Sequence, residues 1–243
     1  MSNESAKGNL KGFYILLAVV AVLGIGAVGY SVGSKALGTA AMEPVDLEGV
    51  GDDMRLLRDL AVPVTKGAED APVTIIVFED YLCNHCAVFS LRERPVIDSE
   101  LVETGKARLV YYDFVLDPRA EAGTFLAARA ARCAGDQGHF WEYQDRLFRS
   151  QITWGQMADK NGIFQDYAES LGMDGGEFRS CLNSDRHAEA VSANRQLAEA
   201  LGLGGTPSVL VGVEGGMSRR LADYSFGSIQ AAVEELTSET GGI

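Results

Sequence analysis

The sequence predicts an α/β domain in which a helical insert separates the strands of one sheet. Two runs rich in β-branched and aromatic residues, 73–78 and 107–115, indicate buried strands. A third run of this kind, 208–212, follows a long stretch of helical periodicity at about 118–201. Because a strand that returns after such an excursion joins the earlier ones, we expect a mixed sheet that carries a helical insert.

Other helices and strands are indicated by local signals around these runs. Asp117 suits an N-cap and Pro118 suits a first helical turn, so we expect a helix from Arg119 to Ala134. After the last buried strand, residues 220–224 indicate an edge strand and residues 226–236 a closing helix.

An uncharged apolar segment precedes this domain. Residues 13–32 contain no charge and are long enough, as a helix, to cross a bilayer of about 30 Å. Lys7 and Lys11 lie before the segment and acidic residues follow it, so the positive-inside rule places residues 1–12 in the cytoplasm. A cleaved signal peptide is the alternative, because residues 39–41 are small. We favour an uncleaved transmembrane anchor, since the apolar run exceeds a usual signal sequence. Either alternative exports the domain.

The segment between the apolar run and the domain is a predicted linker. Residues 33–61 contain Gly, Pro, Asp and Glu, and only residues 54–60 show a periodicity that indicates a short helix or strand. We therefore expect the folded domain at residues 62–243. The net charge of −13 argues against nucleic acid as a partner, because its phosphates would be repelled.

The candidate active site is the C-x-x-C segment Cys83-Asn84-His85-Cys86, which lies where a predicted strand gives way to a helix. The first N–H groups of a helix are unpaired and carry partial positive charge, which stabilises a thiolate. We expect Cys83 to be the exposed nucleophile and Cys86 its shielded partner. His85 is expected to add positive charge, and Asn84 to tune how readily the disulfide is reduced. A structural or metal-binding role for this pair is the alternative.

A second pair of cysteines, Cys133 and Cys181, lies in the insert. In an oxidising compartment two such cysteines usually form a disulfide. This bridge would hold the insert together and stabilise the fold by about 4 kcal/mol on the chain-entropy model. An electron shuttle between the two pairs is the alternative. A four-cysteine zinc site is disfavoured because structural zinc usually draws on closely spaced ligands. His139 and His187 show no ligand spacing, so we expect them to be ordinary surface or core residues.

Three separated segments of the chain resemble the DsbA-like branch of the thioredoxin superfamily. They are residues 78–86, 133–143 and 205–208. The resemblance implies a thioredoxin fold with a helical insert and a thiol:disulfide oxidoreductase activity that needs no organic cofactor and no metal. It also implies a cis bond between Thr206 and Pro207, which together form a shelf for the substrate backbone beside the active-site disulfide.

The chain departs from this family in the position of its acidic residues. Many relatives place an acid six positions before the first cysteine, where it assists proton transfer near the shielded thiol. Val77 occupies that position here. Glu79 and Asp80 lie nearby but do not match the family position, so we expect both to be solvated charges.

The resemblance also implies a role and a location. The protein would donate its Cys83–Cys86 disulfide to reduced exported proteins, anchored in the bacterial cell membrane with its catalytic domain on the extracytoplasmic side. A membrane redox partner of the DsbB or vitamin K epoxide reductase type would reoxidise it. The dipeptide Asn84-His85 departs from the Pro-His of strong oxidants, so a reductase or isomerase is the first alternative. A non-catalytic binding module or chaperone that uses the groove around Pro207 is the second.

Overall fold

The computed structural model describes residues 44–45, 47, 50, 53–119, 122–213 and 216–240. The predicted cytoplasmic N-terminus, the predicted transmembrane segment and the first part of the linker, residues 1–43, lie outside the described residues. Among the helices of the described part, none combines the length and the apolar character needed to span a bilayer. The membrane anchor therefore stays a prediction.

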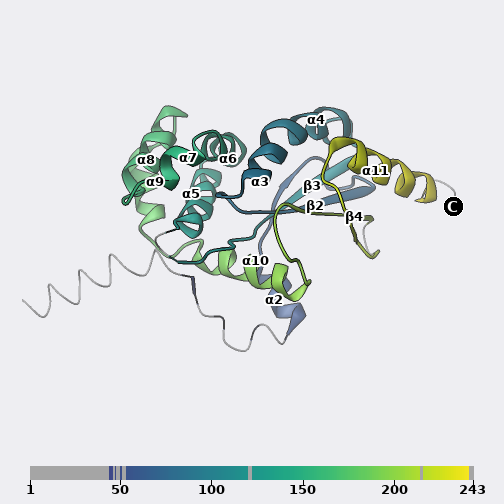
Figure 1. Cartoon of the computed structure of the whole chain (residues 1–243), viewed down its shortest axis with the longest axis horizontal. Helices are drawn as coiled ribbons and strands as arrows, with labels where there is room; N and C mark the ends of the chain where they lie inside the picture. Colours follow the sequence, from purple (N-terminus) through teal and green to yellow (C-terminus); the bar gives the residue numbers. More distant parts are fainter. Residues whose placement is uncertain are drawn as a thin grey trace, which may run out of the picture. The chain divides into compact units, whose positions relative to one another are not determined.

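A five-stranded mixed sheet forms the centre of the domain (Figure 1). Its strands β2 (Val73–Glu79) and β3 (Ala107–Asp113) run parallel, and β4 (Ser208–Val213) pairs with β2 in the antiparallel direction. The short antiparallel strands β1 (Val64–Lys66) and β5 (Arg219–Arg220) form the two edges. The order β1-β3-β2-β4-β5 confirms the mixed sheet that the sequence predicts.

One face of the sheet is covered by α11 (Phe226–Thr240) and by the helix that follows β2 (Figure 1). Pro95 lies within that helix and has no N–H to donate, and wider π-helical turns occur on both sides of it. The successive segments of this helix are α3 (Asn84–Val88), a π-helical turn (Phe89–Glu93), α4 (Arg94–Ile97) and a second π-helical turn (Asp98–Val102).

The opposite face of the sheet is covered by α10 (Ala188–Ala200), and α2 (Met54–Leu60) packs beside it (Figure 1). Leu57 of α2 is fully buried in a core that it shares with Phe78 of β2 and Leu197 of α10. The folded part of the chain therefore begins before residue 62, within the segment that the sequence assigns to the linker. The periodicity of residues 54–60 belongs to a helix that packs on the domain.

The helical insert forms a group at one side of the sheet (Figure 1). Large buried aromatic side chains fill its core, among them Phe125, Tyr143 and Trp154. Arg132 of the insert donates to buried Asp113 of β3 at 2.7 Å, which ties the insert to the sheet. Its helices are α5 (Thr124–Asp136), α6 (Phe140–Arg149), α7 (Gln151–Gly155), α8 (Asn161–Ser170) and α9 (Gly175–Leu182).

The first helix of the insert begins later than the sequence predicts. The Asp117 carboxylate accepts from the N–H of Arg119, as expected of a capping residue, but this contact closes only a local turn. Gly123 then has a φ of 77°, in the left-handed region, so a helix from Arg119 cannot continue through it. Thr124 is therefore the first residue of α5.

The edge of the sheet after β4 also differs from its prediction. The strand β5 consists of Arg219 and Arg220 and is shorter than the expected run of residues 220–224. It ends early because Asp223 accepts from the N–H of Ser225 and starts the turn into α11. The opposite edge strand, β1, is one that the sequence analysis did not identify.

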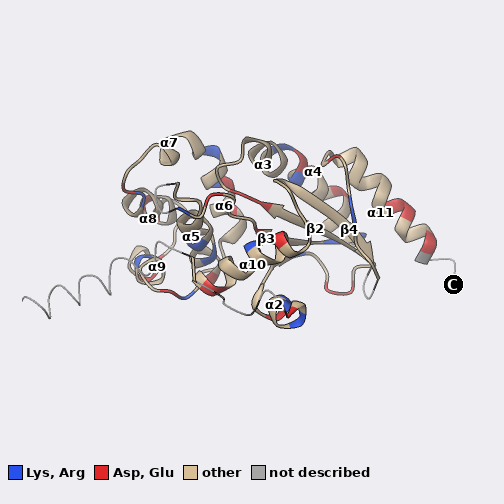
Figure 2. Ribbon diagram, turned by 60° about the horizontal axis from the view of Figure 1, so that its bottom comes forward, with Lys and Arg blue, Asp and Glu red and all other residues tan. Residues whose placement is uncertain are grey.

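Exposed acidic side chains gather at one end of α11, in line with the negative net charge of the chain. Figure 2 shows acidic residues on α11 toward its C-terminal end. These are Glu234, Glu235 and Glu239, whose side chains are exposed. The exclusion of nucleic acid as a partner stays a prediction from the net charge.

Candidate active site

The first cysteine pair, Cys83 and Cys86, lies at the carboxyl end of β2, where α3 begins. Cys83 is the N-cap residue of α3, and its sulfur accepts a hydrogen bond from the N–H of Cys86 at 3.3 Å. Both cysteines are free thiols; Cys83 is partly exposed and Cys86 is buried. Only the first cysteine of the pair is therefore accessible, as its position at the start of the helix predicts.

The two thiols differ strongly in acidity. Hydrogen bonds lower the pKa of Cys83 to about 5, chiefly the one with the Cys86 thiol, with further contributions from Thr206 and from the backbone N–H groups of Cys86 and His85. Burial has the opposite effect on Cys86 and raises its pKa above the ordinary value. At neutral pH the accessible sulfur is a thiolate and the buried one keeps its proton.

The loop before β4 lies directly beside Cys83. The Thr206–Pro207 peptide bond is cis, which confirms the geometry that the resemblance implies. The Cys83 thiol donates to the carbonyl oxygen of Thr206 at 3.3 Å. The Thr206 hydroxyl is buried and has no hydrogen-bond partner among the described residues. This hydroxyl is therefore placed to donate to the sulfur once Cys83 is ionised.

His85 and Asn84, the residues between the two cysteines, are both exposed. The His85 ring lies against Tyr224, with Nδ1 2.9 Å from the tyrosine hydroxyl oxygen. The backbone N–H of His85 contributes to the low pKa of Cys83, whereas the sequence suggested a contribution from the charge of its ring. Tyr224 is a site residue that the sequence analysis missed, because 139 residues separate it from His85 and no motif connects the two.

Glu79 lies at the end of β2 and is buried, not solvated as the sequence suggested; its exposed fraction is 1%. The helix that follows β2 covers this carboxyl end, and Ser90 of that helix donates to Glu79 Oε2 at 2.9 Å. Burial raises the pKa of Glu79 to about 8, against the lowering effect of Ser90 and Arg94. Glu79 is therefore largely protonated at neutral pH.

Asp80 is also buried, with an exposed fraction of 3%. Its two oxygens accept from the backbone N–H groups of Leu82, at 2.7 Å, and of Leu116, at 2.8 Å. Burial raises its pKa to about 6, although both hydrogen bonds favour the charged form. Asp80 thus fixes the loop that carries Cys83, and the expectation of a solvated charge is wrong here too.

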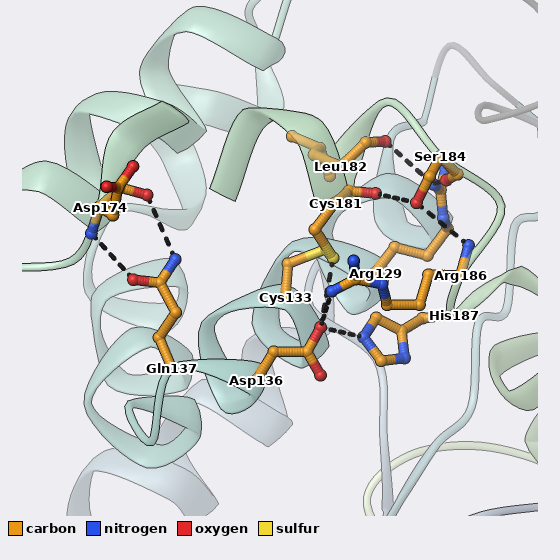
Figure 3. Close-up of a disulfide and its surroundings, with 10 residues drawn as sticks. All are labelled: Arg129, Cys133, Asp136, Gln137, Asp174, Cys181, Leu182, Ser184, Arg186 and His187. Carbon is orange, nitrogen blue, oxygen red and sulfur yellow. Dashed lines mark hydrogen bonds and ion pairs between the residues drawn. A yellow bond between two sulfur atoms is a disulfide. The ribbon is translucent and has the colours of Figure 1, made fainter. Parts of the chain in front are cut away.

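The second cysteine pair, Cys133 and Cys181, forms a disulfide that joins α5 to α9 (Figure 3). Its two Cα atoms are 5.8 Å apart, and 48 positions separate the residues along the chain. Both residues are buried. The structure therefore confirms the pairing that the sequence predicts.

Two further polar side chains, Asp136 and His187, lie beside this disulfide (Figure 3). Asp136 Oδ2 is 3.0 Å from His187 Nε2 and 3.5 Å from Cys181 Sγ. The side chain of His187 is 18% exposed. His139 lies at the N-cap position of α6.

Comparisons with known proteins agree with this fold. Residues 61–220 match the sequence model of the family described as thioredoxin. A protein-disulfide oxidoreductase of Rickettsia felis is 29% identical over 175 residues, which cover 71% of this chain and 59% of the relative. The chain thus spans less than two thirds of that relative. The disulfide bond formation protein D of Bacillus subtilis is 27% identical over 161 residues, which cover 65% of this chain and 70% of that protein.

A solved structure has the same arrangement of helices and strands. The crystal structure of oxidised BdbD from Bacillus subtilis aligns with a TM-score of 0.63 and 22% sequence identity, covering 72% of this chain and 92% of that one. The family match over residues 61–220 shows that the chain belongs to the thioredoxin family, and its structure has a helical insert between β3 and β4.

Proposed function

We propose that the protein is a thiol:disulfide oxidoreductase that introduces disulfides into exported proteins by exchange at Cys83 and Cys86. The observation that carries this proposal is the difference between the two thiols. Cys83 is partly exposed and has its pKa lowered to about 5, while Cys86 is buried and keeps its proton. A sulfur that is both reachable and a stable thiolate is a good leaving group in thiol–disulfide exchange.

The reaction starts from the oxidised Cys83–Cys86 pair. A substrate thiolate attacks the Cys83 sulfur, the bond to Cys86 breaks, and a mixed disulfide forms between Cys83 and the substrate. A second substrate thiolate then attacks the substrate sulfur and releases Cys83 as a thiolate. The substrate loses two electrons and gains a disulfide, and the cysteine pair gains both electrons.

The sulfur of Cys86 needs a proton when it leaves the disulfide, because burial disfavours its thiolate. Glu79 is the group placed to supply this proton. Glu79 is largely protonated at neutral pH, and its ionised form raises the pKa of Cys86, so the two groups interact. We propose that Glu79 takes the role that many relatives give to an acid at the position of Val77.

Substrate binding is proposed for Thr206 and Pro207. The carbonyl oxygen of Thr206 is 3.3 Å from Cys83 Sγ, so an extended substrate backbone laid along this loop would place its cysteine beside the nucleophile. His85 and Asn84 flank the same exposed sulfur and would set how readily the disulfide is reduced.

The location and the redox partner are proposed from the sequence. Residues 13–32 would anchor the chain in the bacterial cell membrane, with the catalytic domain on the extracytoplasmic side. A membrane protein of the DsbB or vitamin K epoxide reductase type would return the pair to its disulfide. The name of the Bacillus subtilis relative, a disulfide bond formation protein, supports the oxidising direction.

The deciding experiment is the redox equilibrium of the full chain with glutathione. We expect a potential well above the value of about −270 mV for thioredoxin and closer to the value of about −120 mV for DsbA, since the Cys83 thiolate stabilises the reduced form. A variant with Cys133 and Cys181 both changed to Ala is the control, because it leaves only the first pair to titrate. A potential near that of thioredoxin would favour the reductase and overturn the oxidase proposal.

A further inference from the structure

We propose that the second cysteine pair belongs to a redox-controlled zinc site. When the disulfide between Cys133 and Cys181 is reduced, the two cysteines, His187 and Asp136 bind one zinc ion. The ion then joins α5 to α9 in place of the disulfide. This site is separate from the first cysteine pair and does not depend on the function proposed for that pair.

Three of the four side chains lie close together, and the fourth, Asp136, contacts two of them. The sulfurs of Cys133 and Cys181 and a ring nitrogen of His187 all lie within 4.8 Å of one another. Asp136 Oδ2 is 3.0 Å from His187 Nε2 and 3.5 Å from Cys181 Sγ. Zinc bonds of about 2.3 Å to sulfur and about 2.0 Å to nitrogen or oxygen separate the ligands of a tetrahedral site by roughly 3.3 to 3.8 Å. The two sulfurs are bonded to each other in the disulfide, so they must move apart on reduction to reach this spacing.

The backbone holds these side chains in place from three helices. Cys133 and Asp136 are three residues apart on α5 and so share one face of that helix. Cys181 belongs to α9, and His187 is the N-cap residue of α10. Figure 3 shows the Asp136 carboxylate beside the sulfur of Cys181, and the His187 imidazole directed toward that carboxylate. Two cysteines, a histidine and a carboxylate form a ligand set that zinc accepts.

The charges around the cluster suit a bound cation. Two thiolates and one carboxylate carry three negative charges, and zinc neutralises two of them. Arg186 faces the third, since its Nη1 donates to Asp136 Oδ2 at 2.8 Å.

A hollow lies beside the carboxylate and the imidazole of the cluster. A hollow of about 430 Å³ is lined by Asp136 and His187, together with Arg132 and Trp141. The side chains of His187 and Asp136 are 18% and 29% exposed, whereas both cysteines are buried. An ion can therefore reach the carboxylate and the imidazole first and then the two sulfurs.

The disulfide-bonded state and the zinc-bound state differ by two electrons and one zinc ion. A dithiol or phosphine reductant supplies two electrons, the S–S bond breaks, and with two protons the sulfurs become thiols. Zinc binding then forms two Zn–S bonds and releases the two protons. A two-electron oxidant reverses the change, since formation of the S–S bond expels the ion. Both states hold α5 and α9 together, so the insert stays closed in reducing as well as oxidising surroundings.

The test uses the full chain with Cys83 and Cys86 both changed to Ser, which leaves the second pair as the only thiols. The chain is reduced with a phosphine, freed of reductant without oxygen, and titrated with cobalt(II), whose thiolate charge-transfer bands report on the ligands. We expect one cobalt per reduced chain, its displacement by zinc, and no binding by the oxidised chain. Absence of these bands from the reduced chain would overturn the proposal.

Matched variants separate this site from binding by two thiols alone. His187→Ala and the nearly isosteric Asp136→Asn should each weaken cobalt and zinc binding by at least about tenfold. His139→Ala is the control, because His139 also precedes a helix but belongs to α6; this variant should bind as the parent does. Thermal unfolding of the oxidised variants checks that each one folds. If His187→Ala binds as tightly as His139→Ala, the four-ligand site is wrong.

Discussion

The two cysteine pairs have the same kinds of neighbour but opposite surroundings. A histidine and a carboxylate lie close to each pair: His85 and Glu79 at the first, His187 and Asp136 at the second. At the first pair burial keeps the carboxyl group protonated, and one sulfur is partly exposed at a helix start. At the second pair the carboxylate is ionised and partly exposed, and both sulfurs are buried between two helices. The first pair thus combines a buried carboxyl group with an accessible sulfur, and the second combines a partly exposed carboxylate with buried sulfurs.

Access and local geometry, rather than the types of neighbouring residue, distinguish the two cysteine pairs. The first pair spans one helical turn, and hydrogen bonds favour its reduced form. The second pair closes a loop of 48 positions, so its reduction removes a long-range restraint on the unfolded chain. The first pair is suited to pass its disulfide on, and the second is suited to keep it.

The strongest test of this comparison is Cys83→Ser. The variant loses the accessible sulfur, so we expect oxidation of a reduced model protein to fall to the uncatalysed rate, because no mixed disulfide can form. The matched control changes Cys133 and Cys181 to Ala and should keep most of the activity. Loss of activity in a folded control would mean that the second pair passes electrons and is not structural. Retained activity in Cys83→Ser would instead favour a binding module.

Loss of the second cysteine pair should lower stability more than loss of the first pair, which is the opposite of the order expected for activity. Changing Cys133 and Cys181 to Ala should lower the free energy of unfolding of the oxidised chain by about 2 to 4 kcal/mol. Changing Cys83 and Cys86 to Ala should have a smaller effect, since that bridge closes a very short loop. Urea unfolding of both variants in parallel measures the difference. Equal losses would show that loop length does not separate the two pairs.

The two carboxyl groups predict opposite dependences on pH. The pKa of Glu79 rises from 4.5 to about 8 on folding, so the folded chain binds the extra proton and Glu79 lowers stability as the pH rises through this window. Glu79→Gln should remove this pH dependence. Its size in the free energy of unfolding is up to about 1.4 kcal/mol for each unit of the pKa difference. It should also slow turnover, since the proton for Cys86 is lost.

Asp136→Asn is the matched control for this pH dependence. The pKa of Asp136 is lowered on folding, so its contribution to stability is present above pH 3.8 and is lost as the pH falls below that value. Asp80 and Cys83 also contribute to the pH dependence between pH 5 and pH 8, so the contribution of Glu79 is the difference between the slopes of the parent chain and of Glu79→Gln. An unchanged slope in Glu79→Gln would contradict the buried, protonated carboxyl group.

The sequence predicted the three main strands and the position of Cys83 at a helix start, because these depend on local runs and spacing. It did not predict the burial of Glu79, since that depends on the helix after β2 covering the end of the strand. Tyr224 and His187 were missed for a similar reason. Each meets its partner only after distant segments have packed, and no periodicity or motif records such a contact.

The smallest predicted effects concern the acidity of Cys83. Thr206→Val removes the hydroxyl that can donate to the thiolate, so the pKa of Cys83 should rise by about one unit, in line with one hydrogen bond to a charged group.

His85→Ala should raise the pKa of Cys83 by less than about half a unit, because alanine keeps the backbone N–H and the lost ring is exposed and screened. Tyr224→Phe, which removes only the hydroxyl beside His85 Nδ1, should change the pKa least. Thiolate absorbance followed through a pH titration measures all three variants. A larger shift for His85→Ala than for Thr206→Val would show that the charge of the imidazole, as the sequence suggested, controls the first pair, and that hydrogen bonding comes second.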